Sequence, residues 1–214
     1  MIILVLAKAP VPGRVKTRLC PPATPEQAAD IAAASLLDTL DVVCSVPGAR
    51  PVVSFAGEIG CAARQKDLVK ALNRTAVFWQ RGQDFANRLA NAHLDVARHC
   101  PGQAVLQIGM DTPQVTPAIL TGAMERLKEF DGVLGRAADG GWWALGLHNP
   151  AEADALRTVR MSRPDTGDLT HAALAHLRIG ELPVLSDVDT MADARQVARQ
   201  VPNGRFAQTV VATA

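Results

Sequence analysis

Short apolar runs alternate with longer amphipathic stretches over most of this 214-residue chain. The apolar runs have the length of buried strands, and the stretches between them repeat their apolar residues with the spacing of a helix. Strands joined through helices form right-handed crossovers and a mostly parallel sheet that is covered on both faces. The sequence therefore predicts an α/β protein with three α/β/α layers.

The expected strands are the runs 2–7, 51–56, 76–80, 104–109, 132–137, 142–147 and 179–185. No helix separates 132–137 from 142–147, which indicates one antiparallel strand in the sheet. Three helices are expected over about 25–43, 84–98 and 170–177. Another follows the strand 51–56 and ends at about 72, and two more begin at 117 and at about 191. We expect QTVVATA (208–214) to be a loose tail or an edge addition. No linker interrupts the pattern, so residues 1–214 are expected to form a single domain.

Composition excludes several classes of protein. The net charge of +1 argues against broad electrostatic binding to nucleic acid or to an anionic membrane, which requires a basic face. The four cysteines are far apart and form no CxxC pair, which favours free thiols in a cytoplasmic protein. No run is long enough to span a membrane. P-loop, HExxH and nucleophile-elbow motifs are absent.

A cluster of cations follows the first expected strand. The stretch AKAPVPGRVKTRL (7–19) contains Lys8, Arg14, Lys16 and Arg18, and the first acid of the chain is Glu26. Prolines and Gly13 make a stiff turn, in which backbone amides and basic side chains can meet phosphate oxygens. A solvated loop is the alternative, but a ligand site lies beyond the carboxyl ends of the strands in such sheets. We therefore favour phosphate binding.

Carboxylates follow three other expected strands. Asp111 comes after 104–109, Asp139 after 132–137, and Asp187 and Asp189 after 179–185. Carboxylate oxygens suit Mg²⁺ or Mn²⁺ beside a diphosphate, so Asp111, Asp187 and Asp189 are predicted metal ligands. We also expect one of the last two to cap the final helix. Asp139 either orients an acceptor hydroxyl or acts as its base, or it only supports its turn.

Two adjacent tryptophans follow the Asp-Gly-Gly turn. On a strand, neighbouring side chains point to opposite faces, so one of Trp142 and Trp143 should pack in the core. The other is free to stack on a sugar or an acceptor, or is also a core residue.

Four segments together resemble a family of small bacterial glycosyltransferase-like proteins with a GT-A, nucleotide-diphospho-sugar transferase fold. They are AKAPVPGRVKTRL, GMDTPQVTPAIL (109–120), VLGRAADGGWWALGL (133–147) and LSDVDTMADA (185–194). QRGQDFANRLANA (80–92) is similar to a fifth block, with Asp84 and Arg88 at its characteristic positions. The same fold and loop also resemble the phospholactate guanylyltransferases. MSRPDTGDLT (161–170) replaces a Trp-Ser-Thr block that is common in the family, which implies a different acceptor.

The resemblance implies a nucleotide above the first half of the sheet. Its contacts would come from Lys8, Gly13, Arg14, Lys16, Arg18, Asp84 and Arg88. It also implies Mg²⁺ or Mn²⁺ on Asp111, Asp187 and Asp189, with Gly140, Gly141 and Trp142 on the sugar or acceptor side.

The resulting hypothesis is a metal-dependent transferase that takes a nucleotide-activated donor, foremost a nucleoside-diphosphate sugar. Asp111 and Asp139 are its expected catalytic carboxylates. A nucleotidylyltransferase that releases pyrophosphate and a non-catalytic nucleotide-binding module are the alternatives. Expected partners are the donor and an acceptor of unknown identity, and the pattern is compatible with a homodimer.

Overall fold

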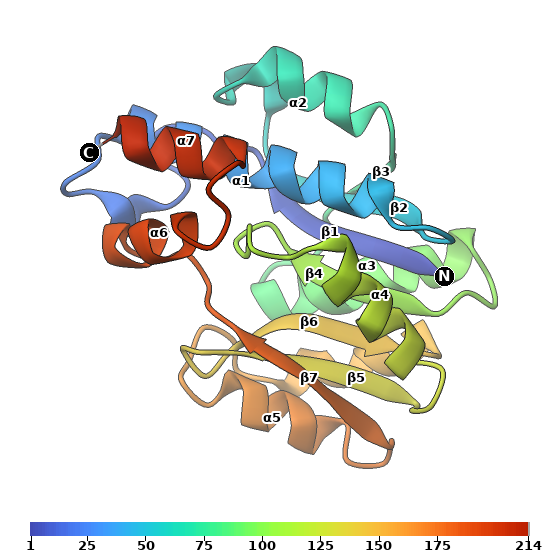
Figure 1. Ribbon diagram of the computed structural model, residues 1–214. Helices are drawn as coiled ribbons and strands as arrows, with labels where there is room; N and C mark the ends of the chain where they lie inside the picture. Colours follow the sequence, from blue (N-terminus) through green and yellow to red (C-terminus); the bar gives the residue numbers. More distant parts are fainter. Residues whose placement is uncertain (214) are drawn as a thin grey trace.

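The computed structural model describes residues 1–213 and contains a seven-stranded sheet in the order β3-β2-β1-β4-β6-β5-β7 (Figure 1). The strands are β1 (Ile2–Lys8), β2 (Arg50–Ala56), β3 (Ala76–Trp79), β4 (Val105–Gly109), β5 (Gly132–Ala137), β6 (Trp142–Leu147) and β7 (Ile179–Leu185). β6 runs antiparallel to β4 and β5, whereas the other neighbours are parallel. The predicted α/β fold with one antiparallel strand is confirmed.

The helices connect these strands in the predicted rhythm. They are α1 (Pro25–Ser45), α2 (Gln65–Leu72), α3 (Phe85–His99), α4 (Pro117–Arg126), α5 (Thr166–Ala173), α6 (Met191–Ala198) and α7 (Arg205–Ala212). Short 3-10 helices η1 (Thr17–Leu19), η2 (Ile59–Cys61) and η3 (Pro150–Thr158) complete the order. Thr24 and Gln27 form the predicted capping box, which satisfies backbone donors at the start of α1.

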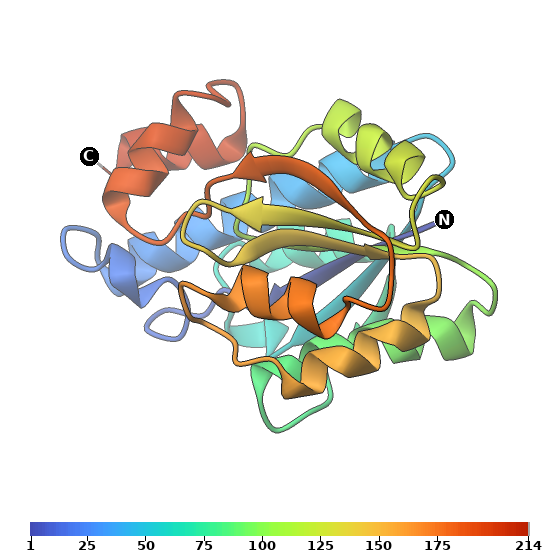
Figure 2. The same ribbon diagram turned by 90° about the horizontal axis from the view of Figure 1, so that it is seen from below.

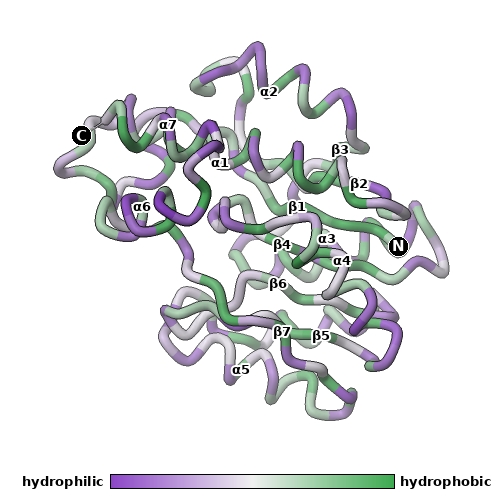
Figure 3. The backbone as a smooth tube through the Cα atoms, in the orientation of Figure 1, coloured by the Kyte–Doolittle hydropathy of each residue, from purple (hydrophilic) through white to green (hydrophobic). Residues whose placement is uncertain are grey.

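Two helical layers enclose the sheet (Figure 2). Apolar residues of α1, α2 and α4 pack on one face, and those of α3, η3 and the end of α5 pack on the other. Figure 3 shows hydrophobic residues concentrated along the central strands. Val5 and Leu4, for example, are fully buried against opposite layers, because successive residues of a strand point to opposite faces.

The direction of chain growth reverses between β1 and β4. From β1 the chain moves outward through β2 to β3, and it then crosses through α3 to β4 on the other side of β1. The segments that follow β1 and β4 therefore diverge at the carboxyl edge, which leaves room for a ligand. The cationic stretch and Asp111 follow these two strands.

The end of the chain is not the loose tail or edge addition that we expected. It contains the helix α7, whose Phe206, Ala207 and Val210 are buried together with residues of α1 and α6. Arg205 begins this helix and pairs with Asp38 and Asp41 of α1. The expectation was wrong because the segment 208–214 omits the apolar residues of the first helical turn.

The helix expected at 170–177 begins four residues earlier, at Thr166. The backbone at its start packs closely on the turn between β5 and β6, where Gly167 N donates to Gly140 O at 2.8 Å. Gly140 has φ +88, and a Cβ there would collide with the carbonyl oxygen of Pro164. The absence of a side chain at Gly140 thus fixes how this turn meets the segment 161–167.

We predict that Gly140→Ala lowers the free energy of unfolding by about 3 kcal/mol or more, because it adds a collision to an unfavourable φ. Gly102 is the matched control, since it has φ +74 but no atom lies within 4 Å of the place that a Cβ would take. Gly102→Ala should cost only about 1–2 kcal/mol. Urea denaturation of the two variants measures this, and equal losses would contradict the packing argument.

His93 of α3 predicts acid sensitivity. Its ring is fully buried, neither nitrogen has a hydrogen-bond partner, and burial lowers its pKa to about 3. The unfolded chain then binds the proton more readily than the folded chain below a pH of about 6.5. Stability is therefore fully present above that pH and falls by up to about 1.4 kcal/mol per pH unit toward pH 3.

Urea denaturation at pH 7 and at pH 4.5 tests this effect. We expect His93→Phe to reduce the loss of stability on acidification, while His171→Phe, which changes an exposed histidine of α5, should leave it unchanged. An unaltered loss in His93→Phe would assign the acid sensitivity to other groups.

Candidate functional site

The cationic loop, residues 9–19, is tied down at the carboxyl end of β1. Lys8 Nζ donates to the carbonyl oxygen of Arg14 at 2.8 Å, and Lys8 N donates to Met110 Sδ at 3.3 Å. Gly13 has φ +72 within the turn, a conformation that glycine adopts at little cost. Lys8 thus supports the loop through Arg14 and connects the end of β1 to Met110, which follows β4.

The ammonium of Lys16 lies between two carboxylates. Lys16 Nζ is 3.1 Å from Asp111 Oδ1 and 3.3 Å from Asp189 Oδ1, and the side chain is only 13% exposed. Burial by itself lowers the pKa of Lys16, but the two carboxylates outweigh it and leave that pKa above its usual value. Arg18 adds a second cation, with NH1 2.8 Å from Asp189 Oδ2. The loop is therefore bound to the acids by charge.

The acids come together from three separate segments. Asp111 follows β4, Asp139 lies in the turn between β5 and β6, and Asp187 follows β7. Val188 N donates to Asp111 O at 3.0 Å, which joins the first and third segments. Burial, with the nearby charges of Asp111 and Asp139, raises the pKa of Asp187 to about 7. Asp187 therefore lies where negative charge is incompletely compensated.

The predicted capping role of Asp187 or Asp189 is wrong. Thr190 caps α6 instead, and Asp193 completes its capping box. Both earlier carboxylates are thus left for other contacts. The sequence LSDVDTMADA offers several residues that can cap a helix, and the choice among them depends on where the helix begins.

Two cavities adjoin at these residues. The loop cavity has a volume of about 500 Å³ and is lined by Lys8, Arg14, Lys16, Arg18, Asp111, Asp189 and their neighbours. The inner cavity has a volume of about 190 Å³ and lies between the sheet, the start of α3 and the segment 161–166. Asp111 and Ser162 line both cavities.

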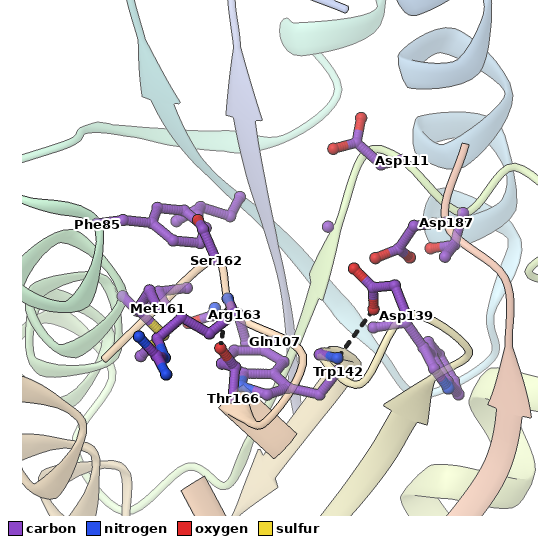
Figure 4. Close-up of a pocket in the computed structure, with 16 residues that line it drawn as sticks. Phe85, Gln107, Asp111, Asp139, Trp142, Met161, Ser162, Arg163, Thr166 and Asp187 are labelled. Atoms are coloured by element: carbon purple, nitrogen blue, oxygen red, sulfur yellow. Dashed lines mark hydrogen bonds between the residues drawn. The ribbon is translucent and has the colours of Figure 1, made fainter. Parts of the chain in front are cut away.

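Figure 4 shows the inner cavity, with Asp111, Asp139 and Asp187 on one side and Phe85 and Met161 on the other. Asp139 Oδ1 accepts a hydrogen bond of 2.8 Å from Gly141 N, which orients this carboxylate. The turn that Gly140 and Gly141 form therefore supports the acidic wall.

The two tryptophans point to opposite faces of the sheet, as predicted. Trp143 is 2% exposed within the core on the side of α1, and its Nε1 donates to Pro183 O at 2.9 Å. Trp142 packs on the opposite face and lines the inner cavity, where its Nε1 donates to Thr170 Oγ1 at 3.1 Å. Trp142 thus offers an aromatic wall to a ligand.

Asp84 and Arg88 are not among the residues that line the two cavities. Asp84 caps α3 by accepting from Asn87 N at 2.8 Å, and this hydrogen bond is the main cause of its lowered pKa. Arg88 Nε donates to Gly82 O at 3.3 Å. In this structure both residues hold the start of α3, so their contact with a nucleotide stays a prediction.

Several cavity residues were missed from the sequence. They include Phe85, Gln107, Thr112, Met161, Arg163 and Thr166. Gln107 carried a usable signal, because it is the polar residue in the apolar run AVLQIG. The segment 161–166 gave no such signal except that it departs from the family pattern. Its place beside the cavity depends on the fold and cannot be read from the sequence.

The donor chemistry of the acids suits a hard divalent cation. Among residues 1–213, however, no group of three or more His, Cys, Asp or Glu side chains is arranged around a common metal position. The predicted set of Asp111, Asp187 and Asp189 is not preassembled, because Lys16 lies between Asp111 and Asp189. A metal ion held by both Asp111 and Asp189 would compete with this ammonium for their carboxylates.

Within the described part of the chain, no helix combines the length and the apolar character needed to cross a membrane.

Comparison with solved structures identifies the fold. A protein from Desulfovibrio desulfuricans G20, named as a candidate nucleotide-diphospho-sugar transferase, is 25% identical with a TM-score of 0.83, over 98% of this chain and 92% of that one. Rv0371c from Mycobacterium tuberculosis H37Rv is 23% identical with a TM-score of 0.60, over 92% and 98% of the two chains. A second structure of Rv0371c is a complex with manganese, with a TM-score of 0.55.

A nucleotidyl transferase from Methanothermobacter is 18% identical with a TM-score of 0.53, over 95% of this chain and 99% of that one. These structures share the nucleotide-diphospho-sugar transferase fold with this chain. None of the curated proteins matches it.

One family model matches residues 39–163, more than half of the chain, and its description is "Uncharacterized protein conserved in bacteria". The match includes β4, Asp111 and both tryptophans, and it ends with residues 161–163, which line the inner cavity. The chain therefore belongs to the bacterial family DUF2064.

Proposed function

We propose that this protein is a metal-dependent transferase that takes a nucleotide-activated donor, foremost a nucleoside-diphosphate sugar. One observation carries the proposal: a cationic cavity and an acid-lined cavity meet at Asp111, beyond the ends of β1 and β4, where the segments that follow the two strands diverge. The first cavity suits phosphate oxygens, and the second suits a group that reacts beside them.

The loop cavity would hold the diphosphate of the donor. Arg14, Lys16 and Arg18 supply cations there. Gly13 lies next to this lining in the chain, and its turn would let backbone amides approach an anion. Its volume of about 500 Å³ lies in the range of ordinary small-molecule sites. Asp84 and Arg88 would contact the nucleotide only if it extends from this cavity toward α3.

Mg²⁺ or Mn²⁺ would be held by Asp111 and Asp187, with Asp189 as the third predicted ligand. When bound, such an ion neutralises charge on a leaving diphosphate. Asp187 suits this role because its half-buried carboxylate lies near Asp111 and Asp139. Asp189 pairs with two cations, Lys16 and Arg18, whereas Asp111 pairs with Lys16 alone. The manganese complex of Rv0371c supports a divalent ion in this fold.

The acceptor side would be the inner cavity. Asp139 lies on its wall with one oxygen fixed by Gly141 N, so its carboxylate can position an acceptor hydroxyl and take its proton. Trp142 also lines this cavity and provides an aromatic surface against which a sugar ring can pack.

A nucleotidylyltransferase that releases pyrophosphate from a nucleoside triphosphate is the second candidate. The likeness to the Methanothermobacter nucleotidyl transferase favours it. It would use the same cationic loop and the same acids, so the two candidates differ in the phosphate product that they release.

A product assay with Mn²⁺ and then Mg²⁺ tests the proposal on a panel of nucleotide sugars and nucleoside triphosphates. We expect slow release of a nucleoside diphosphate from one sugar donor, lost on chelation of the metal. Pyrophosphate from a triphosphate would instead assign the second candidate. Tight nucleotide binding without turnover in any combination would favour a non-catalytic binding module.

Asp111→Asn and Lys16→Ala should each lower turnover by at least about 100-fold, because each removes charge beside the transferred group. Glu125→Gln and Lys128→Ala are matched controls, since these residues form an exposed ion pair on and just beyond α4. We expect the controls to keep full activity. Near-normal turnover in either site variant, at unchanged thermal stability, would remove that residue from the mechanism.

A further inference from the structure

The inner cavity carries information about the chemistry of its ligand. From its lining we infer that it takes a neutral, hydroxyl-bearing group no larger than about a monosaccharide, and that Gln107 recognises a hydroxyl of that group. This inference rests on the proposed function, because it names the group that would react beside the diphosphate.

Gln107 is a polar side chain in the middle of a buried strand. It is 1% exposed, it lines the inner cavity, and its Oε1 has no hydrogen-bond partner (Figure 4). Leaving a buried acceptor unpaired costs about 1–3 kcal/mol. A hydroxyl donor brought by a ligand would recover this cost, and such a site discriminates strongly against analogues that lack the hydroxyl.

Thr112 provides a second unpaired group in the same lining. It is 1% exposed, and its Oγ1 also lacks a hydrogen-bond partner. Gln107 belongs to β4, and Thr112 lies three residues beyond the end of this strand. β4 and the loop that follows it therefore offer two hydrogen-bonding groups to a ligand with more than one hydroxyl.

The charges around the cavity disfavour an anion. Asp111, Asp139 and Asp187 line it, and the basic residue in the lining, Arg163, is already paired with Asp165 at 3.0 Å. Lys16 compensates Asp111 from the loop cavity at 3.1 Å, which leaves Asp139 and Asp187 as the carboxylates of this lining. A phosphorylated or carboxylated acceptor would lie beside these two acids and be repelled by their charge, whereas a neutral one would not.

The remaining walls are apolar, and the space is small. Leu6, Phe85, Leu89, Trp142 and Met161 supply hydrophobic surface to the lining, with Phe85 and Met161 across from the carboxylates (Figure 4). The volume of the inner cavity, about 190 Å³, is less than half that of the loop cavity, about 500 Å³. A polyol or sugar ring matches this combination, because it presents C–H groups to an aromatic wall and hydroxyls to polar groups.

The hydroxylated group could belong to the donor sugar or to a separate acceptor. Ligand-observed NMR with methyl glucoside and glycerol, and with phosphoenolpyruvate and 3-phosphoglycerate as anionic probes, measures binding of free molecules. Calorimetry with UDP and GDP, each with and without an attached glucose, measures the donor arm. If the attached glucose raises the affinity of UDP or GDP in calorimetry and the free probes do not bind, the group belongs to the donor. Binding of the free probes would assign it to an acceptor.

We expect neutral probes to bind with Kd values near about 1 mM, as is usual for ligands of this size. Gln107→Met removes the amide at similar volume. It should weaken the affinity for the neutral probes, or the affinity added by the attached glucose, about tenfold, while the affinity for UDP or GDP stays unchanged. Thr39→Val is the matched control, because Thr39 is a buried polar residue of α1 on the other side of the sheet. It should bind every probe like the wild type.

The inference is overturned if no hydroxylated probe binds in either arm, if the phosphorylated acids bind the inner cavity more tightly than the neutral probes, or if Gln107→Met binds like the wild type. Lys16→Ala separates the two cavities, since acids that bind only through the loop cavity are lost in this variant. Nucleotide turnover with an unaffected Gln107→Met would overturn this inference alone. If the neutral hydroxylated probes bind but no nucleotide does, the proposed function is overturned, whereas the inference about the inner cavity is kept.

Discussion

The ion pairs of Lys16 hold together the part of the molecule on which the site depends. A buried ammonium is stable only when carboxylates compensate it, and Asp111 and Asp189 reach it from segments that lie far apart in the sequence. These contacts fix the cationic loop over the ends of β1 and β4. They also place a cation on two of the three carboxylates that are proposed to hold the metal.

The order of the elements could be predicted well from the sequence, because its apolar periodicity is strong and its caps are explicit. The capping box of Thr24 and Gln27 and the lone antiparallel strand are clear cases. The start of α5 and the helix α7 could not be predicted, because both depend on contacts with distant segments. Thr166 begins its helix where the turn at Gly140 meets it, and Phe206 is buried only because α1 and α6 surround it.

The candidate site shows the same division. The charged residues could be named because each follows a strand, and the edge of a parallel sheet brings such residues together. The pairing of Lys16 with two acids and the structural roles of Asp84 and Arg88 needed coordinates. Gln107 lies between these cases, since its polarity is visible in the sequence but its lack of a partner is not.

Ser162 belongs to the walls of both cavities, and the segment that carries it packs on the turn of Gly140. A ligand that displaces this segment on entering one cavity therefore changes the shape of the other. By reciprocity, each ligand then alters the affinity for its companion by the same factor. The two binding events would be thermodynamically coupled, and the order in which substrates arrive would become a property of this short stretch of backbone.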